Sequence, residues 1–174
     1  MGGYPLKLQH FAFVCLVSLT PTLAVADPIM IEGVQMSRDF PCDGQDVVVA
    51  GQGNTVELKG RCGDVKVIGV DHTVAFDEAK SLLVSGMSIK ATGGETGKLL
   101  VEVHKNTVKT KIISQDAPAE VLISGADQDV ALTVGSAAKI DVMGSKNVLS
   151  WSADNGIKAP AISTSGDGNK VSKR

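Results

Sequence analysis

Aliphatic and polar residues alternate along the chain in a phrase that recurs seven times between Val47 and Lys173. Each copy reads aliphatic, any, aliphatic, any, glycine, two free positions, an Asn-like residue, any, aliphatic. The clearest copies are 47–56 and 140–149. Because side chains two residues apart on a strand share a face, the phrase predicts a strand, a tight corner and a second strand.

Glycine occupies six of the seven corner positions, which we call anchors: Gly51, Gly69, Gly86, Val103, Gly125, Gly144 and Gly166. The third residue after each anchor is Asn54, His72, Ile89, Asn106, Gln128, Asn147 or Asn169. Glycine reaches positive φ without a clash, and asparagine tolerates the left-handed region. We therefore predict structural turn positions at Gly51, Asn54, Gly69, Gly86, Asn106, Gly125, Gly144, Asn147, Gly166 and Asn169. Stacked amides in this column would form a partial ladder, interrupted at His72 and Ile89.

A tandem repeat of this length predicts that successive copies stack on one another. The fold class that we expect is all-β: a single-domain β-solenoid, or parallel β-helix-like stack, of about seven short rungs. The alternative is an antiparallel β-sandwich, which short strands and frequent turns would also suit. The copy that begins at Leu82 has a poor second strand, and we expect residues 92–97 to bulge out as a loop.

The N-terminal segment differs from the repeats. Lys7 and His10 precede the apolar run 11–19, and Ala24-Val25-Ala26 places small residues where signal peptidase reads them, so residues 1–26 are predicted to be a signal peptide cleaved before Asp27. Residues 27–46 fit the phrase poorly and are expected to form an N-terminal cap, followed by a solenoid domain over 47–174. The remaining sequence has no segment apolar enough to span a bilayer after cleavage, which predicts a periplasmic or secreted protein.

Cys42 and Cys62 remain after the expected cleavage. In an oxidising compartment this pair favours a disulfide between adjacent rungs, with two free thiols as the alternative. The whole chain has a formal net charge of −2, and its charges are scattered. This balance gives no reason to expect nucleic acid as a partner.

The candidate chemistry is sparse. His72, His104, Asp71, Asp77 and Glu78 are the residues that an enzyme would have to bring together, and each also fits an ordinary turn position. The segment 165–169 weakly resembles one copy of a calcium-binding glycine–aspartate repeat. We expect no cofactor, no metal site and no catalytic constellation.

Several motifs stand out together: Cys42, the phrase at 51–56, Gly60-Arg61-Cys62, the strand at 65–69 and the closing phrase at 165–171. With these motifs the chain resembles a family of exported bacterial proteins known as domain of unknown function 3060. The resemblance covers roughly Cys42 to Lys173. It implies secretion and a repeat fold, and it implies no activity and no functional residues.

These observations predict a non-catalytic structural or protein-binding module of the bacterial envelope, with an unknown protein partner. The alternative is an envelope enzyme that acts on glycans or peptidoglycan.

Overall fold

The strands wind into a parallel stack. The computed structural model describes residues 27–115 and 117–174, so the expected signal peptide, 1–26, lies outside the described residues. The strands are β1 (Ile29–Val34), β2 (Ser37–Pro41), β3 (Val47–Gln52), β4 (Thr55–Val70), β5 (Thr73–Met87), β6 (Lys90–Thr96), β7 (Lys98–His104), β8 (Thr107–Ile112), β9 (Ala119–Ile123), β10 (Asp129–Val134), β11 (Ala138–Ser145), β12 (Val148–Ala153), β13 (Ala161–Asp167) and β14 (Lys170–Lys173). Every pairing between them is parallel. The expected β-solenoid is therefore confirmed, and the antiparallel sandwich is excluded.

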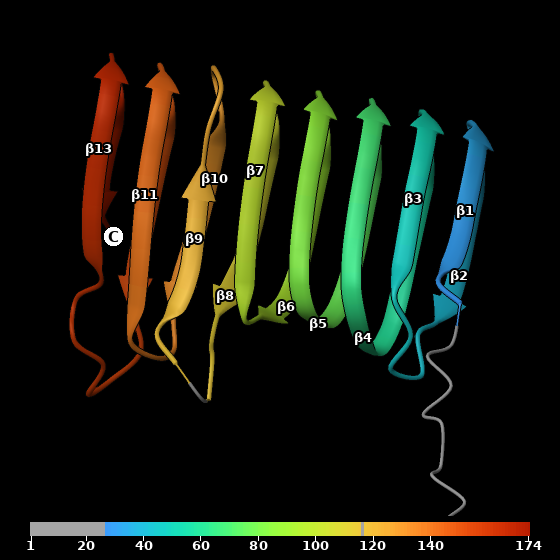
Figure 1. Ribbon diagram of the computed structural model, residues 1–174, viewed down its shortest axis with the longest axis horizontal. Coiled ribbons are helices and arrows are strands. Elements are labelled where there is room, and N and C mark those ends of the chain that lie inside the picture. Colours follow the sequence, from blue (N-terminus) through green and yellow to red (C-terminus); the bar gives the residue numbers. More distant parts are fainter. Residues whose placement is uncertain (1–26, 116) are drawn as a thin grey trace, which may run out of the picture.

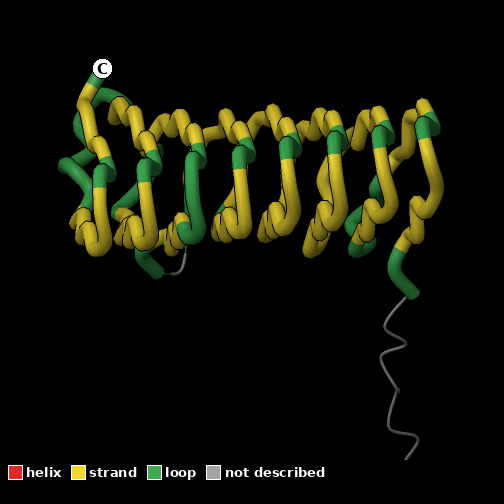
Figure 2. The backbone as a smooth tube through the Cα atoms, turned by 90° about the horizontal axis from the view of Figure 1, so that it is seen from above, coloured by secondary structure: helices red, strands yellow, loops and turns green. Residues whose placement is uncertain are grey.

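Each rung of the stack has two broad sides. The first side consists of β1, β3, the end of β4, the end of β5, β7, β9, β11 and β13, which lie next to one another in Figure 1. The second side consists of β2, the starts of β4 and β5, β6, β8, β10, β12 and β14. Seen from above in Figure 2, each rung crosses from one side to the other at a short loop. Short segments on a third side lead to the next rung. We number the rungs 1 to 8 by their first aliphatic residue: Ile29, Val47, Val65, Leu82, Leu99, Val121, Ile140 and Ile162.

The aliphatic columns form the interior. Val49 pairs with Val67, and the same column continues through Val84, Val101, Ile123 and Val142. Each of these side chains is fully buried. Because the rungs are in register, equivalent side chains stack about 4.8 Å apart and exclude water from one continuous core.

Residues 29–41 form a rung, although we expected them to lie outside the repeat. Ile31 pairs with Val49 and Gly33 with Gly51, and β2 continues the second side beside β4. This rung was hidden because Arg38 stands in an aliphatic column and Met36 in the asparagine column. A terminal rung packs against one neighbour only, so these positions tolerate such residues.

The expected loop at 92–97 is also wrong, because β6 continues as a strand through Thr96. Gly93 pairs with Phe76 of the preceding rung. A Cβ atom at Gly93 would collide with the Phe76 ring. The large ring thus fills the space that a side chain would occupy on rung 4, and the glycine is accommodated within a strand.

The third side carries the disulfide between Cys42 and Cys62, which confirms the expected pairing. Their Cα atoms are 4.8 Å apart, which matches the spacing of neighbouring rungs. Both residues are buried. The bond therefore ties rung 1 to rung 2 beneath their third side.

Replacing both cysteines with alanine should lower the free energy of unfolding by roughly 3 kcal/mol, because the bond closes a loop of about 20 residues in the unfolded chain. Denaturant unfolding with and without reductant measures this effect. The free energy of unfolding of the wild-type protein should fall when reductant is added, and that of the double variant should not change. Equal stability of oxidised and reduced wild-type protein would contradict the expectation.

Candidate functional site

The corners between the first and second sides carry the most regular chemistry of the chain. A Cβ atom on Gly51, Gly69, Gly86, Gly125, Gly144 or Gly166 would collide with the carbonyl oxygen of the anchor one rung earlier. All of these except Gly86 also have φ between 95° and 135°. Most anchors are therefore glycine for two separate reasons: close approach of two backbones, and a conformation that L side chains disfavour.

The left-handed residue of each corner is the one before the asparagine column. Gln35, Gly53, Asp71, Ser88, Lys105, Asp127, Lys146 and Gly168 all have φ between 53° and 67°. The asparagines themselves lie outside this region, contrary to our expectation. Their role in the corner is hydrogen bonding rather than backbone conformation.

Val103 is the exception among the anchors. It is a β-branched residue with φ of 80°, and its side chain is 53% exposed. Such a residue at positive φ is strained, because its Cβ atom crowds the backbone. The exposed side chain gains little burial in return.

Val103→Gly should therefore raise the free energy of unfolding by about 1 kcal/mol, since relief of the strain exceeds the entropic cost of a new glycine. Thermal and denaturant unfolding measure this change. Val70→Gly is the matched control, because Val70 is also exposed near a corner but lies outside the left-handed region. We expect the control to be destabilised; a loss of stability in both variants would refute the strain at Val103.

Buried amides join the corners into a ladder. The Oδ1 atom of Asn147 accepts a hydrogen bond from the Gln128 backbone N–H at 3.0 Å, and its Nδ2 atom donates to the carbonyls of Met143 and Gly125 at 2.9 and 3.2 Å. Asn54, Asn106 and Asn169 repeat this arrangement on their own rungs. Among the described residues no buried side-chain nitrogen or oxygen lacks a partner. The ladder thus satisfies the polar groups of a dry corner.

His72 belongs to this ladder, although we expected it to interrupt the column. Its Nδ1 atom lies 3.2 Å from the Asn54 backbone nitrogen, and its Nε2 atom lies 3.2 Å from the Ile68 carbonyl oxygen. A neutral ring with the proton on Nε2 accepts the first bond and donates the second, as an asparagine amide does. Ile89 has no such groups, so between rungs 2 and 8 the ladder breaks on rung 4 alone.

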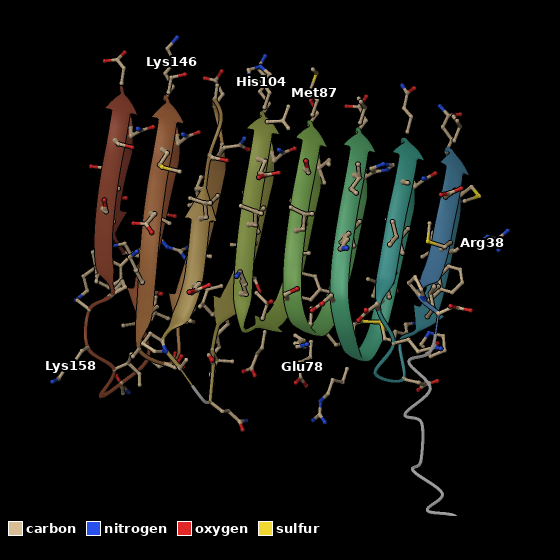
Figure 3. All side chains as sticks on the ribbon, in the orientation of Figure 1. Arg38, Glu78, Met87, His104, Lys146 and Lys158 are labelled. Atoms are coloured by element: carbon tan, nitrogen blue, oxygen red, sulfur yellow. A yellow bond between two sulfur atoms is a disulfide. The ribbon has the colours of Figure 1, made fainter. Side chains whose placement is uncertain are left out.

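The five candidate catalytic residues lie at two opposite edges of the stack. Asp71, His72 and His104 lie at the corner edge, whereas Asp77 and Glu78 lie near the third side. Figure 3 shows His104 and Glu78 at opposite edges of the strands. Six residues of extended chain separate Asp71 from Asp77, or roughly 20 Å.

The acidic candidates also have structural partners. Asp77 accepts the Gly60 backbone N–H at 2.8 Å, and Glu78 pairs with Arg61 at 3.1 Å. His104 Nδ1 lies 3.6 Å from an Asp127 carboxylate oxygen. In the part of the chain that the structure describes, no three His, Cys, Asp or Glu side chains gather as metal ligands. In the segment 165–169, which resembles a calcium-binding repeat, the Asn169 amide is already hydrogen-bonded within the corner ladder.

An open groove of about 630 Å³ runs along the third side, next to the disulfide. Its charged residues include Arg61, Glu78 and Glu95. The hydrogen bonds that Lys111 donates to Glu95 and Asp154 raise the pKa of its ammonium group above the ordinary value. The charges here are used in ion pairs between rungs, so the groove offers no single sign of charge to a ligand.

The outward surface of the first side has an apolar centre, and we call this surface the apolar face. Its outward columns hold three of the nine large hydrophobic side chains that are exposed, Met30, Ile68 and Met143, and the adjoining corner edge holds four more, Val34, Val70, Met87 and Val103. Leu83, Leu100 and Leu122 lie half-buried in one column at its centre. Soluble proteins seldom leave such a surface without a use, so the apolar face is the best candidate for a binding site.

The opposite surface, which we call the polar face, is formed by the outward side chains of the second side. One outward column includes Thr55, Thr73, Lys90, Thr107 and Asp129. The other outward column includes Glu57, Thr92, Lys109 and Ser150. The two broad surfaces of the molecule therefore differ in chemistry while sharing one core.

Our sequence analysis missed the apolar face because it followed only the inward columns. The column three residues before the anchor contains the signal: Met30, Val48, Lys66, Leu83, Leu100, Leu122, Asp141 and Ser163. Three successive leucines at outward positions are unusual for a solvated face.

Comparison with known proteins adds a family and no activity. Residues 49–107 match a family described as "Protein of unknown function (DUF3060)". No curated protein and no solved structure matches the chain. Among the described residues, no helix is long and apolar enough to cross a membrane. The matched segment spans most of rungs 2 to 4 and the start of rung 5, so the similarity to the domain of unknown function 3060 family is shown over residues 49–107.

Proposed function

We propose that this protein is an exported, non-catalytic binding module of the bacterial envelope, located in the periplasm or secreted, and that it binds protein through its apolar face. The observation that carries the proposal is the unequal distribution of hydrophobic side chains: the outward columns of the first side hold Met30, Ile68 and Met143 exposed and Leu83, Leu100 and Leu122 half-buried. Protein contacts favour such surfaces, where apolar area is flat, continuous and bordered by charge.

The stack is suited to a structural role in that contact. Ladder hydrogen bonds, buried amides and a disulfide hold the backbone, so the face needs little ordering when it binds. The separation of the candidate catalytic residues, and their use in corner and ion-pair contacts, support binding over catalysis.

Capture from envelope extract tests this function. The wild-type protein should retain a protein partner, either a second copy of itself or another envelope protein, and Leu100→Asp on the apolar face should lose it. Lys109→Asp on the polar face is the matched control and should behave like the wild type. Equal capture by all three proteins would contradict the proposal.

Export has its own test. The exported protein should begin at Asp27, because the small residues at 24–26 suit cleavage by signal peptidase. Intact mass and N-terminal sequencing of protein from the periplasm and the medium measure this. A chain that keeps Met1 and stays in the cytoplasm would refute the location.

A further inference from the structure

The apolar face has a pattern of charge that is complementary to itself. Along its central column, Leu83, Leu100 and Leu122 occupy rungs 4, 5 and 6. Lys66 stands at the same position on rung 3, and Asp141 on rung 7. A basic and an acidic residue therefore lie at equal distances, two rungs each, on either side of Leu100.

From this arrangement we propose that the partner of the apolar face is a second copy of the same chain, related by a two-fold axis that runs along the strand of rung 5. The inference rests on the proposed use of this face and names its occupant. Under such an axis rung 3 of one copy faces rung 7 of the other, and each contact occurs twice.

The axis places complementary residues opposite one another. Lys66 faces Asp141 of the second copy, and Leu83 faces Leu122. In the neighbouring outward column Ile68 faces Met143, and at the start of the strands Asp64 faces Lys139. Leu100 packs against itself at the centre. Opposite charges thus flank an apolar centre, as in specific protein interfaces.

The surface has room for a stable contact. The axis along rung 5 brings rungs 2 to 8 of the two copies together, and seven strands about 4.8 Å apart and about six residues long give a face of about 34 by 20 Å. Two such faces in contact bury roughly 1,350 Å², which is within the range of standard-size interfaces. A depression of about 310 Å³ beside Leu100 and Leu122 would receive side chains from the facing copy.

Glu102 opposes the arrangement, because the axis places it opposite itself on rung 5. Lys98, at the start of the same strand, also meets its own copy, but its ammonium group is already paired with Glu120 at 2.9 Å. Like charges that face each other weaken an interface. Removing the charge of Glu102 should therefore tighten the dimer.

Sedimentation equilibrium of the mature chain tests the register through charge reversal. Lys66→Asp and Asp141→Lys should each raise the dimer dissociation constant by roughly a hundredfold, since each creates two like-charge pairs. The double variant Lys66→Asp/Asp141→Lys should return close to the wild-type value. Glu102→Gln should lower the dissociation constant, and Lys109→Asp on the polar face should leave it unchanged. Thermal unfolding of each variant checks that the fold is intact.

A wild-type protein that stays monomeric at all concentrations would overturn the inference, as would a double variant that is as weak as the single ones. A different result tests the proposed function. If the chain is monomeric but Leu100→Asp still abolishes capture of another envelope protein, the binding face stands and its occupant is a different protein.

Discussion

Gly144→Ala should destabilise the protein by about 2–5 kcal/mol. Gly144 has φ of 103°, and a Cβ atom there would collide with the Gly125 carbonyl oxygen. A left-handed L residue costs about 1–2 kcal/mol, and overpacking against a rigid backbone costs about 1–3 kcal/mol more. Equilibrium unfolding in urea measures the loss, with circular dichroism as the signal for strand content.

Two matched variants separate the two causes. Gly60 has φ of 76° and nothing within 4 Å of the added Cβ atom, so Gly60→Ala should show the conformational cost alone, roughly 1 kcal/mol. Gly86 lies outside the left-handed region but faces the Gly69 carbonyl, so Gly86→Ala should show the collision alone. Stability of Gly144→Ala equal to that of Gly60→Ala would show that the close approach of the rungs contributes nothing.

Asn147→Leu should lower the free energy of unfolding by about 3 kcal/mol. The leucine has similar size but leaves the Gln128 N–H without its acceptor in a fully buried corner, and it also removes the donor to Met143. An orphaned buried donor or acceptor costs about 1–3 kcal/mol. Denaturant unfolding measures the total, and amide exchange at Gln128 reports the local opening.

Asn169→Leu is the control, because Asn169 makes the same bonds on the last rung, where water can replace them. It should cost clearly less than the same change at Asn147. His72→Asn should leave stability nearly unchanged, since an amide reproduces both bonds of the ring. A large loss at His72→Asn together with a small loss at Asn147→Leu would contradict the proposed ladder.

The repeat columns could be predicted from sequence because each inward position obeys a single requirement. Val49, Val67 and Val84 need only to be aliphatic and in phase to build the core. The disulfide could be predicted because Cys42 and Cys62 are the two cysteines left after the expected cleavage, and their separation of about one repeat places them on adjacent rungs. Both features can be recognised from the sequence alone, without knowing which side chains contact one another across rungs.

The features that the sequence did not reveal depend on contacts between rungs. Gly93 looked like a break, but the Phe76 ring of the preceding rung fills its place. Met36 and Arg38 hid the first rung, because a terminal rung obeys fewer packing requirements. His72 looked like an interruption, and only the position of its two ring nitrogens showed that it replaces an amide.

The apolar face was missed for a related reason. Whether Lys66 and Asp141 flank a leucine stripe depends on which strands are neighbours, and this order came from the pairing of rungs 3 to 7. Outward side chains do not pack in the core, so their identities are not restricted to aliphatic residues. Their pattern can be interpreted only when it is known which strands are neighbours on the surface.

The central claim is that successive coils place equivalent residues in shared internal columns. Methyl–methyl NOEs among selectively labelled valines test it most directly in solution. The account predicts contacts between Val49 and Val67, between Val67 and Val84, and between Val84 and Val101, because these pairs lie on neighbouring parallel strands. Valines two rungs apart, such as Val49 and Val84, should show none. Absence of the contacts between neighbouring rungs, or a direct contact between Val49 and Val84, would contradict the stacked solenoid.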